Sequence, residues 1–181
     1  VFTLNDTEVC AEAGHTIWQV AHQQGIDIPH LCYRDEDSYR ADGNCRACMV
    51  EIEGERVLAA SCKRKISNGM VVSSESEKVK TSQKLVMELL LSDQPDKHSS
   101  HDPQSHFWRM ADHHGLEKAR FPEAKLPHKA NLKADNSHPA IAVNMDACIQ
   151  CGLCVRACRE VQANDVIGFA GRGADTHIIF D

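Results

Sequence analysis

The chain has 181 residues, of which 42% are apolar, and its net charge is −6. This length allows one or two small domains. The acidic balance and the lack of a basic patch argue against nucleic-acid binding, and no apolar run approaches the roughly 18 residues of a membrane span. No secretory signal pattern is present, so we expect a cytoplasmic protein. The nine cysteines, an odd number, then favour metal sites over disulfides.

Two short strands are expected at the start of the chain, at residues 2–4 and 7–10. Asn5 and Asp6 between them suit a tight hairpin turn. Cys10 falls in the second strand, and we interpret it as a small core residue.

A short helix is expected next, at residues 16–24. Thr16 is a suitable N-cap residue, and Gly25 is a typical residue just beyond a helix C-terminus. Residues 26–29 end in proline and predict an extended segment that leads to Cys32.

Four cysteines follow in the pattern Cys32-x12-Cys45-x2-Cys48-x13-Cys62. Four thiolates are the ligand set of a [2Fe–2S] cluster, although the plant-type ferredoxin has four residues between its first two ligands, not twelve. Buried free cysteines and a zinc site are the alternatives. Zinc sites usually combine two close cysteine pairs, whereas Cys32 and Cys62 are single. We therefore predict a [2Fe–2S] site.

Strands are expected on the C-terminal side of the central pair, at residues 49–53, 56–60 and 71–72. The resulting order is strand, strand, helix, metal loop and strands. This order predicts an α+β fold in which residues 1–75 form a β-grasp [2Fe–2S] ferredoxin-like domain.

Residues 76–140 are interpreted as a helix followed by a His-rich connector. Ser74 and Glu77 match a capping box for the helix, and Pro95 prevents its continuation. A second short helix is expected at residues 103–114, with Asp102 as its cap and proline at its first position. Its buried face is expected to comprise Phe107, Met110 and Ala111, with Trp108 beside them.

The connector has no cysteine, since none occurs between residues 63 and 147. Its histidines could be read as metal ligands, but we favour a solvated linker and predict no cluster in residues 93–140. The part after Pro122 is expected to be extended and draped over a neighbour, because it holds further prolines and few apolar residues.

A second metal motif reads Cys148-x2-Cys151-x2-Cys154-x3-Cys158, the run found in bacterial [4Fe–4S] ferredoxins. In two-cluster ferredoxins the fourth cysteine binds the other cluster. We therefore predict that Cys148, Cys151 and Cys154 hold a first [4Fe–4S] cluster and that Cys158 holds a second.

Two strands at residues 166–169 and 177–180, joined by a turn at 171–173, would make residues 141–181 the first half of a [4Fe–4S] ferredoxin-like domain. The glycines of this turn are too few for a dinucleotide-binding motif. We expect the mirrored half in a longer polypeptide, of which this chain is an N-terminal piece with a processed or trimmed start.

Together the two cysteine blocks resemble the N-terminal iron–sulfur region shared by three enzyme systems. These are the large iron–sulfur subunit of complex I, [FeFe] and NAD-reducing hydrogenases, and the α subunit of NAD-dependent molybdenum or tungsten formate dehydrogenases. The stretches 102–108, 120–122 and 154–162 look most like the formate dehydrogenase branch. The family often carries a His-x3-Cys-x2-Cys-x5-Cys cluster between the blocks, and here its three cysteines are missing.

The resemblance implies an electron-transfer region with no catalytic residue of its own. Formate would be oxidised at a molybdenum or tungsten bis-pterin centre elsewhere in the same subunit, and electrons would pass to a partner subunit that carries FMN and binds NAD. A hydrogenase or complex I subunit is one alternative. A zinc-stabilised interaction module is another.

Overall fold

The computed structural model describes residues 1–37, 39–121, 135–138 and 141–180. The chain divides into two compact units, Val1–Met87 and Glu88–Asp181. Both units mix helices and strands, so the predicted α+β class is confirmed.

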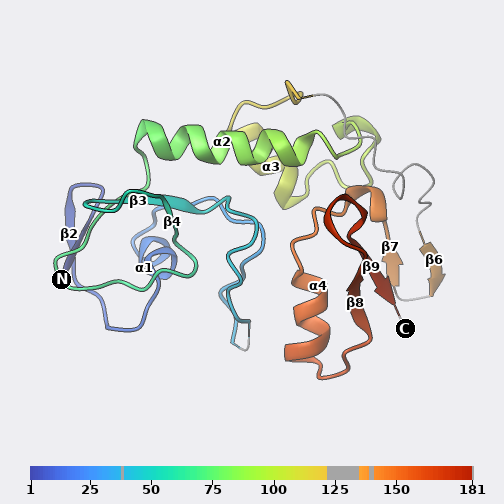
Figure 1. Ribbon diagram of the computed structural model, residues 1–181, viewed down its shortest axis with the longest axis horizontal. Coiled ribbons are helices and arrows are strands. Elements are labelled where there is room, and N and C mark those ends of the chain that lie inside the picture. The colour runs from blue at the N-terminus through green and yellow to red at the C-terminus, as the bar shows by residue number, and fades with distance from the viewer. Residues whose placement is uncertain (38, 122–134, 139–140, 181) are drawn as a thin grey trace. The chain divides into compact units, whose positions relative to one another are not determined.

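A five-stranded sheet with the order β2-β1-β5-β3-β4 forms the centre of the first unit (Figure 1). β1 pairs in parallel with β5, and the other neighbours are antiparallel. The predicted strands are all present, although the fourth is only two residues long. Their bounds are β1 Phe2–Leu4, β2 Thr7–Val9, β3 Met49–Ile52, β4 Ala59–Ala60 and β5 Val71–Ser73.

The turn between β1 and β2 has the conformation that its residues favour. Asn5 and Asp6 both have positive φ, at 47° and 64°, as a tight hairpin turn requires. The expectation for Cys10 is wrong. Strand β2 ends at Val9, and Cys10 is exposed just beyond it. The buried residue at the end of this strand is Val9, not Cys10.

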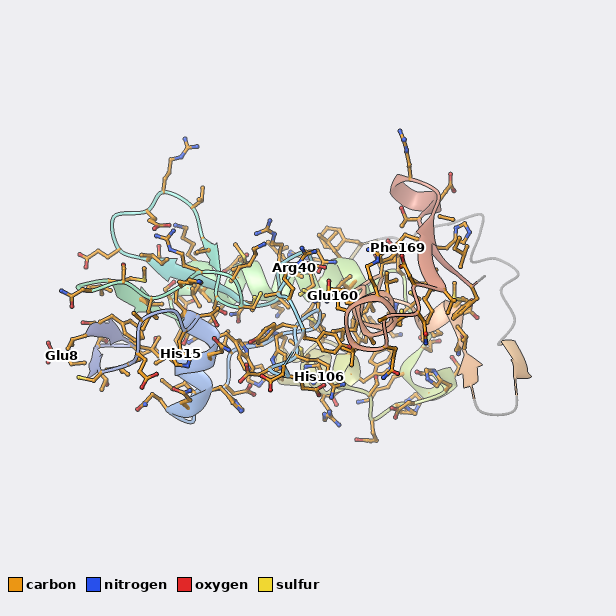
Figure 2. All side chains as sticks on the ribbon, turned by 90° about the horizontal axis from the view of Figure 1, so that it is seen from below. Glu8, His15, Arg40, His106, Glu160 and Phe169 are labelled. Atoms are coloured by element: carbon orange, nitrogen blue, oxygen red, sulfur yellow. The ribbon has the colours of Figure 1, made fainter. Side chains whose placement is uncertain are left out.

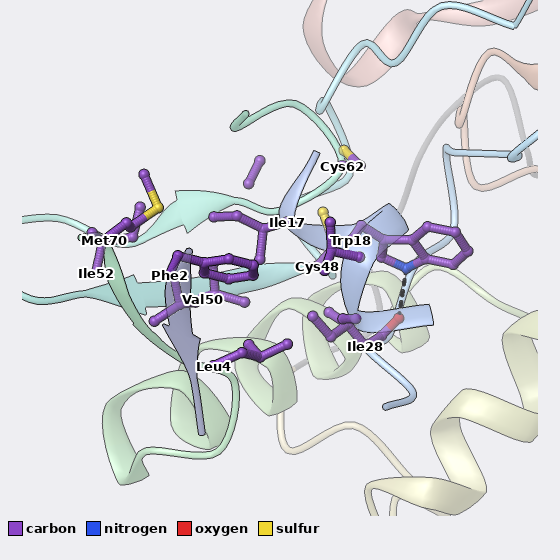
Figure 3. Packing of buried hydrophobic residues seen from close by; sticks show 14 of the residues in the cluster. Phe2, Leu4, Ile17, Trp18, Ile28, Cys48, Val50, Ile52, Cys62 and Met70 are labelled. Carbon is purple, nitrogen blue, oxygen red and sulfur yellow. Dashed lines mark hydrogen bonds between the residues drawn. The ribbon is translucent and has the colours of Figure 1, made fainter. Parts of the chain in front are cut away.

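Helix α1, Ile17–Gln23, packs on this sheet and is capped as predicted. The Thr16 hydroxyl accepts from the Gln19 N–H, and the Gln19 side chain accepts from the Thr16 N–H, so the cap is a full capping box. Alternating strand residues and one helix face enclose the core, which Figure 3 shows at close range. Its fully buried members include Phe2, Leu4, Ile17, Val20, Ile28, Val50 and Val72.

Helix α2, Glu77–Leu91, starts at a different cap from the one predicted. The Ser76 hydroxyl accepts from the Val79 N–H at 3.3 Å, as an N-cap side chain does. Ser74 instead pairs with Asn5. Its N–H donates to Asn5 Oδ1, and its hydroxyl accepts from Asn5 Nδ2, both at 2.8 Å. The tertiary contact with Asn5 removes Ser74 from the capping role.

In the second unit a 3₁₀ turn, η1 (Lys97–Ser99), precedes helix α3, His106–His113. The predicted cap at Asp102 is wrong. Asp102 accepts from the Gln104 N–H and closes a turn, while Ser105 caps the helix. The predicted buried face is confirmed, because Phe107, Trp108, Met110 and Ala111 are all buried.

Short elements make up the rest of the second unit (Figure 1). Two hairpins, β6–β7 and β8–β9, are antiparallel, and the second corresponds to the predicted final pair of strands. The bounds are β6 Asp135–His138, β7 Ile141–Val143, η2 Met145–Ala147, α4 Leu153–Arg156, η3 Ala157–Val161, β8 Ile167–Ala170, η4 Gly173–Asp175 and β9 His177–Phe180.

Much of the predicted extended connector, residues 122–134, lies outside the described residues. Within the part of the chain that is described, no helix combines the length and the apolar character needed to cross a bilayer.

Candidate metal centre

The four cysteines of the first motif lie on the loop after α1 and on the turn after β4. Cys32, Cys48 and Cys62 are almost completely buried, and Cys45 is half-buried. Cys48 and Cys62 both pack within the core cluster of the unit, where Figure 3 labels them. The fold therefore brings together residues that are far apart in sequence.

Glycine is required at the approach to the central pair. Gly43 has φ = +66°, and a Cβ there would lie 3.4 Å from the Lys63 side chain and 3.6 Å from Ala60. The absence of a side chain lets the loop pass close to the segment that carries Cys62. Arg46, between the two close cysteines, also has positive φ, at 59°. This tight turn places both thiols on one loop.

Helix α1 fixes both segments that flank this loop. Trp18 Nε1 donates to the Ile28 carbonyl at 3.0 Å, which anchors the extended segment leading to Cys32 (Figure 3). The first N–H groups of the helix have no partner inside it. Here the Ile17 and Trp18 N–H groups donate to the carbonyls of Arg64 and Ser61, at 2.9 and 3.1 Å. The start of the helix is thus bound directly to the Cys62 turn.

The four thiols form two hydrogen-bonded pairs, Cys32 with Cys45 and Cys48 with Cys62. The thiol of Cys32 lowers the pKa of Cys45 to about 6, assisted by the Ala47 N–H. The thiol of Cys62 likewise lowers the pKa of Cys48 to about 7. The same hydrogen bonds and burial raise the pKa values of Cys32 and Cys62. Each pair therefore holds one thiolate near neutral pH.

Two pairs of thiols suit two irons, because each iron of a Cys₄ [2Fe–2S] cluster takes two thiolates. The donors are sulfur only, the site is shielded from water, and backbone N–H groups favour the thiolate of Cys45. No three Cys, His, Asp or Glu side chains among the described residues converge around a single metal-ion position. The residues present thus fit a binuclear cluster.

The second motif forms a loop and a short helix in the second unit. Cys148 and Cys151 are half-buried, Cys154 is exposed and Cys158 is buried. Although Cys154 as a residue is exposed, the surrounding loop atoms desolvate its sulfur and raise the pKa of this thiol, and the nearby Cys148 and Cys158 raise it further. Positive φ at Gln150 (54°) and Gly152 (73°) turns the chain between these cysteines. Sulfur donors on such a loop are what a cubane requires.

Helix α4 continues into a π-helical turn, η3, at Cys158. The Gln162 N–H bonds the Ala157 carbonyl five residues back, at 2.9 Å. The chain then returns, and the Val166 N–H donates to Cys158 Sγ at 3.2 Å. Turns of this type are frequent at functional sites. Here the turn leaves Cys158 buried with a backbone donor on its sulfur.

A buried guanidinium supports this loop from inside. Arg156 is only 4% exposed, and it donates to the carbonyls of Gly152 and Cys151 at 3.4 and 3.3 Å. Gly152 also faces the ring of Phe169, which Figure 2 labels, and a Cβ would lie 3.5 Å from that ring. Arg156 and Phe169 therefore enclose the loop between the second and third cysteines.

Sequence reasoning missed several groups that surround the thiols. These are the hydroxyl of Ser61, the guanidinium of Arg156 and the N–H groups of Ala47 and Val166. The position of Ser61 next to Cys62 in sequence was a usable signal. The others depend on backbone geometry or on burial, which no pattern in the sequence marks.

Two domain families match the two units. Residues 1–77 match the 2Fe-2S iron-sulfur cluster binding domain, and residues 138–180 match the ferredoxin-like domain of NADH-quinone oxidoreductase subunit 3. The first match contains all four cysteines of the first motif, and the second contains all four of the second motif. The chain therefore has a [2Fe–2S] and a [4Fe–4S] type of cluster-binding domain.

Whole-chain similarity points to respiratory and hydrogen-metabolising enzymes. The chain is 35% identical to the mitochondrial NADH-ubiquinone oxidoreductase 78 kDa subunit of Candida albicans, over 97% of its own length and 24% of that protein. It is 34% identical to an NADH-quinone oxidoreductase subunit of Rickettsia typhi, over 94% and 25% of the two lengths. It thus spans about a quarter of these relatives.

A solved structure has the same fold along nearly the whole chain. It is the crystal structure of an NAD+-reducing [NiFe]-hydrogenase in the H2-reduced state, with a TM-score of 0.86 and 28% sequence identity. The match covers 99% of this chain and 74% of the hydrogenase chain. The predicted combination of two ferredoxin-like domains is confirmed by this likeness.

Proposed function

We propose that this chain carries single electrons within an oxidoreductase complex. The chain matches the iron–sulfur region of the large NADH-quinone oxidoreductase subunits named above and of NAD-reducing hydrogenase. The paired arrangement of Cys32, Cys45, Cys48 and Cys62 inside a [2Fe–2S] type domain is the observation that carries the proposal.

Each motif is assigned to its own cluster. Cys32, Cys45, Cys48 and Cys62 hold a [2Fe–2S] cluster in a functional domain of residues 1–75. Cys148, Cys151 and Cys154 hold a [4Fe–4S] cluster, and Cys158 serves a second [4Fe–4S] cluster. Residues 76–140 connect the two sites without a cluster of their own.

The clusters supply one-electron redox chemistry, and the protein controls it through ligands, burial and hydrogen bonds. The core of the first unit keeps water from three of the four thiols. The Ala47 and Val166 N–H groups face Cys45 and Cys158, and each such donor favours negative charge on its sulfur. The turn after β4 and the start of α1 hold the ligands in place.

The partner proposed for this region is a subunit that carries FMN and binds NAD, in a cytoplasmic assembly. The relatives named above favour an NADH-quinone oxidoreductase or an NAD-reducing hydrogenase. A formate dehydrogenase with a molybdenum or tungsten bis-pterin centre is the finer proposal, and it is supported by sequence resemblance alone. Reducing the intact complex with NADH, H₂ or formate, and following the [2Fe–2S] EPR signal, separates these enzymes.

Metal analysis tests the proposal against a zinc-stabilised interaction module. The chain purified anaerobically after iron-replete expression should be brown and contain acid-labile sulfide, with two irons assigned to the first motif. A colourless protein that contains zinc and no sulfide would contradict the proposal.

A further inference from the structure

The hydroxyl of Ser61 has no hydrogen-bond partner among the described residues, sulfur included, although the side chain is 0% exposed. A buried hydroxyl without a hydrogen bond costs about 1–3 kcal/mol. Such groups are rare in folded proteins and call for an explanation. The cluster that the adjacent cysteines would hold can supply the missing acceptor.

The backbone of Ser61 is held directly between the cluster ligands. Its N–H donates to the Cys48 carbonyl at 3.0 Å, and its carbonyl accepts from the Trp18 N–H at 3.1 Å. Cys62 is the next residue along the chain. The backbone of Ser61 is therefore anchored on both sides, and its hydroxyl lies next to Cys48 and Cys62, which would together hold one iron of the cluster.

The sulfur of Cys48 is within reach of this hydroxyl. After the Cys62 thiol, burial and the Cys62 backbone N–H, the nearby Ser61 side chain is a further influence on Cys48, and it lowers the pKa of that thiol. A hydroxyl donates one hydrogen bond, and sulfur accepts it better as a thiolate than as a thiol.

We propose that the Ser61 O–H donates a hydrogen bond to Cys48 Sγ when the [2Fe–2S] cluster is bound, and that this bond raises the reduction potential of the cluster. This inference rests on the function proposed above. Reduction adds one negative charge to the cluster, so a donor on a ligand sulfur stabilises the reduced form more than the oxidised form. Ser61 is thus a tuning residue that does not itself ligate iron.

The test compares Ser61→Ala with Ser74→Ala in the full chain. Ser74 is a matched control because it lies in the same unit and is also nearly buried, but its hydroxyl already accepts from Asn5 Nδ2 at 2.8 Å. Redox titration followed by EPR should show the Ser61→Ala cluster about tenfold harder to reduce at a fixed ambient potential, which is about 59 mV for one electron. Ser74→Ala should leave the potential unchanged.

In the cluster-free protein, Ser74→Ala should lower stability more than Ser61→Ala, which is the reverse of their effects on the reduction potential. Ser74→Ala removes an acceptor from Asn5 and should shift the urea midpoint downwards, whereas Ser61→Ala removes a hydroxyl with no partner and should not. An unchanged potential in Ser61→Ala, with its cluster retained, overturns the role of Ser61 but leaves the [2Fe–2S] assignment intact. If the wild-type chain binds no [2Fe–2S] cluster, the proposed function itself fails.

Resonance Raman spectroscopy of the wild-type chain covers the case in which Ser61→Ala does not retain its cluster. Exchange from H₂O into D₂O should shift the iron–sulfur stretching bands that involve Cys48, because a hydrogen-bonded O–H becomes O–D. Absence of any such shift would overturn the proposed hydrogen bond.

Discussion

At the scale of single residues, the pairing of thiols determines how the first site responds to pH. The hydrogen bonds that lower the pKa values of Cys45 and Cys48 raise those of Cys32 and Cys62. One thiol of each pair is therefore prepared to bind metal as a thiolate near neutral pH.

A pH dependence of the cluster-free protein follows. An unfolded cysteine has a pKa of about 8.5. Between pH 6 and that value the unfolded chain binds more protons than the folded one, because folding lowers the pKa values of Cys45 and Cys48, so stability should rise with pH. Above the pKa of an unfolded cysteine the folded chain binds more protons than the unfolded one, because folding raises the pKa values of Cys32 and Cys62. Stability should therefore fall with pH in this range. Anaerobic urea denaturation at several pH values measures the resulting maximum in the free energy of unfolding. Cys45→Ser should make this maximum smaller.

The buried Arg156 should be necessary for the second site, whereas Arg159 should not. Arg156→Gln removes the guanidinium donors from the carbonyls of Cys151 and Gly152, although the Gly152 carbonyl keeps its bond from the backbone N–H of residue 156 at 3.0 Å. Arg159 is exposed and makes a surface ion pair with Asp165, and such pairs contribute little to stability. Iron release to a chelator should therefore be faster in Arg156→Gln and unchanged in Arg159→Gln. Equal rates in the two variants would contradict the supporting role of Arg156.

Residue-level prediction succeeded where chemistry is local and failed where it depends on tertiary contacts. The Asn5-Asp6 turn and the Thr16 cap were predictable because both act on their own backbone. Ser74 matched a capping box equally well, but its hydrogen bonds go to Asn5, and Ser76 caps the helix. A contact between residues 69 positions apart cannot be inferred from a four-residue pattern.

At the scale of secondary-structure elements, the turn between β8 and β9 depends on one glycine. Gly171 has φ = +75°, and a Cβ there would lie 2.2 Å from the Asp175 carbonyl oxygen. Gly173 also has positive φ, at 59°, but a Cβ there would meet nothing within 4 Å. The two glycines therefore separate the effect of backbone conformation from that of steric overlap.

Alanine at these two positions should have different consequences. Gly173→Ala should cost about 1 kcal/mol, from its left-handed conformation alone. Gly171→Ala should cost clearly more, because the backbone must also move to relieve the overlap. Chemical denaturation measures both changes, and hydrogen exchange of the β8 and β9 amides locates them. Similar losses in both variants would show that the hairpin does not depend on close packing at Gly171.

The elements were more predictable than their ends. Hydrophobic alternation and turn residues gave every strand of the first sheet, yet the strand expected at residues 56–60 is reduced to Ala59–Ala60. Helix α3 begins at His106, because the Ser105 hydroxyl accepts from the Trp108 N–H. Asp102 followed by proline is an equally good starting signal in sequence. Competition between neighbouring caps is decided by packing.

At the scale of the whole molecule, the two cysteine motifs fall in two units and in two separate domain matches. No ligand is shared between the motifs, so loss of one cluster should not remove the other. This modular organisation was readable from the spacing of the cysteines. The kind of enzyme was not, because the cysteine motifs bind clusters and carry no substrate chemistry.

EPR spectroscopy of the dithionite-reduced full chain and three cysteine variants tests the central claim most directly. The wild type and Cys10→Ser should show the S = 1/2 signal of a reduced [2Fe–2S] cluster, since Cys10 is exposed beyond β2. Cys48→Ser should lose or markedly alter that signal, and Cys148→Ser should retain it unchanged. A signal that survives unaltered in Cys48→Ser, or that disappears in Cys148→Ser, would contradict a [2Fe–2S] cluster held by Cys32, Cys45, Cys48 and Cys62.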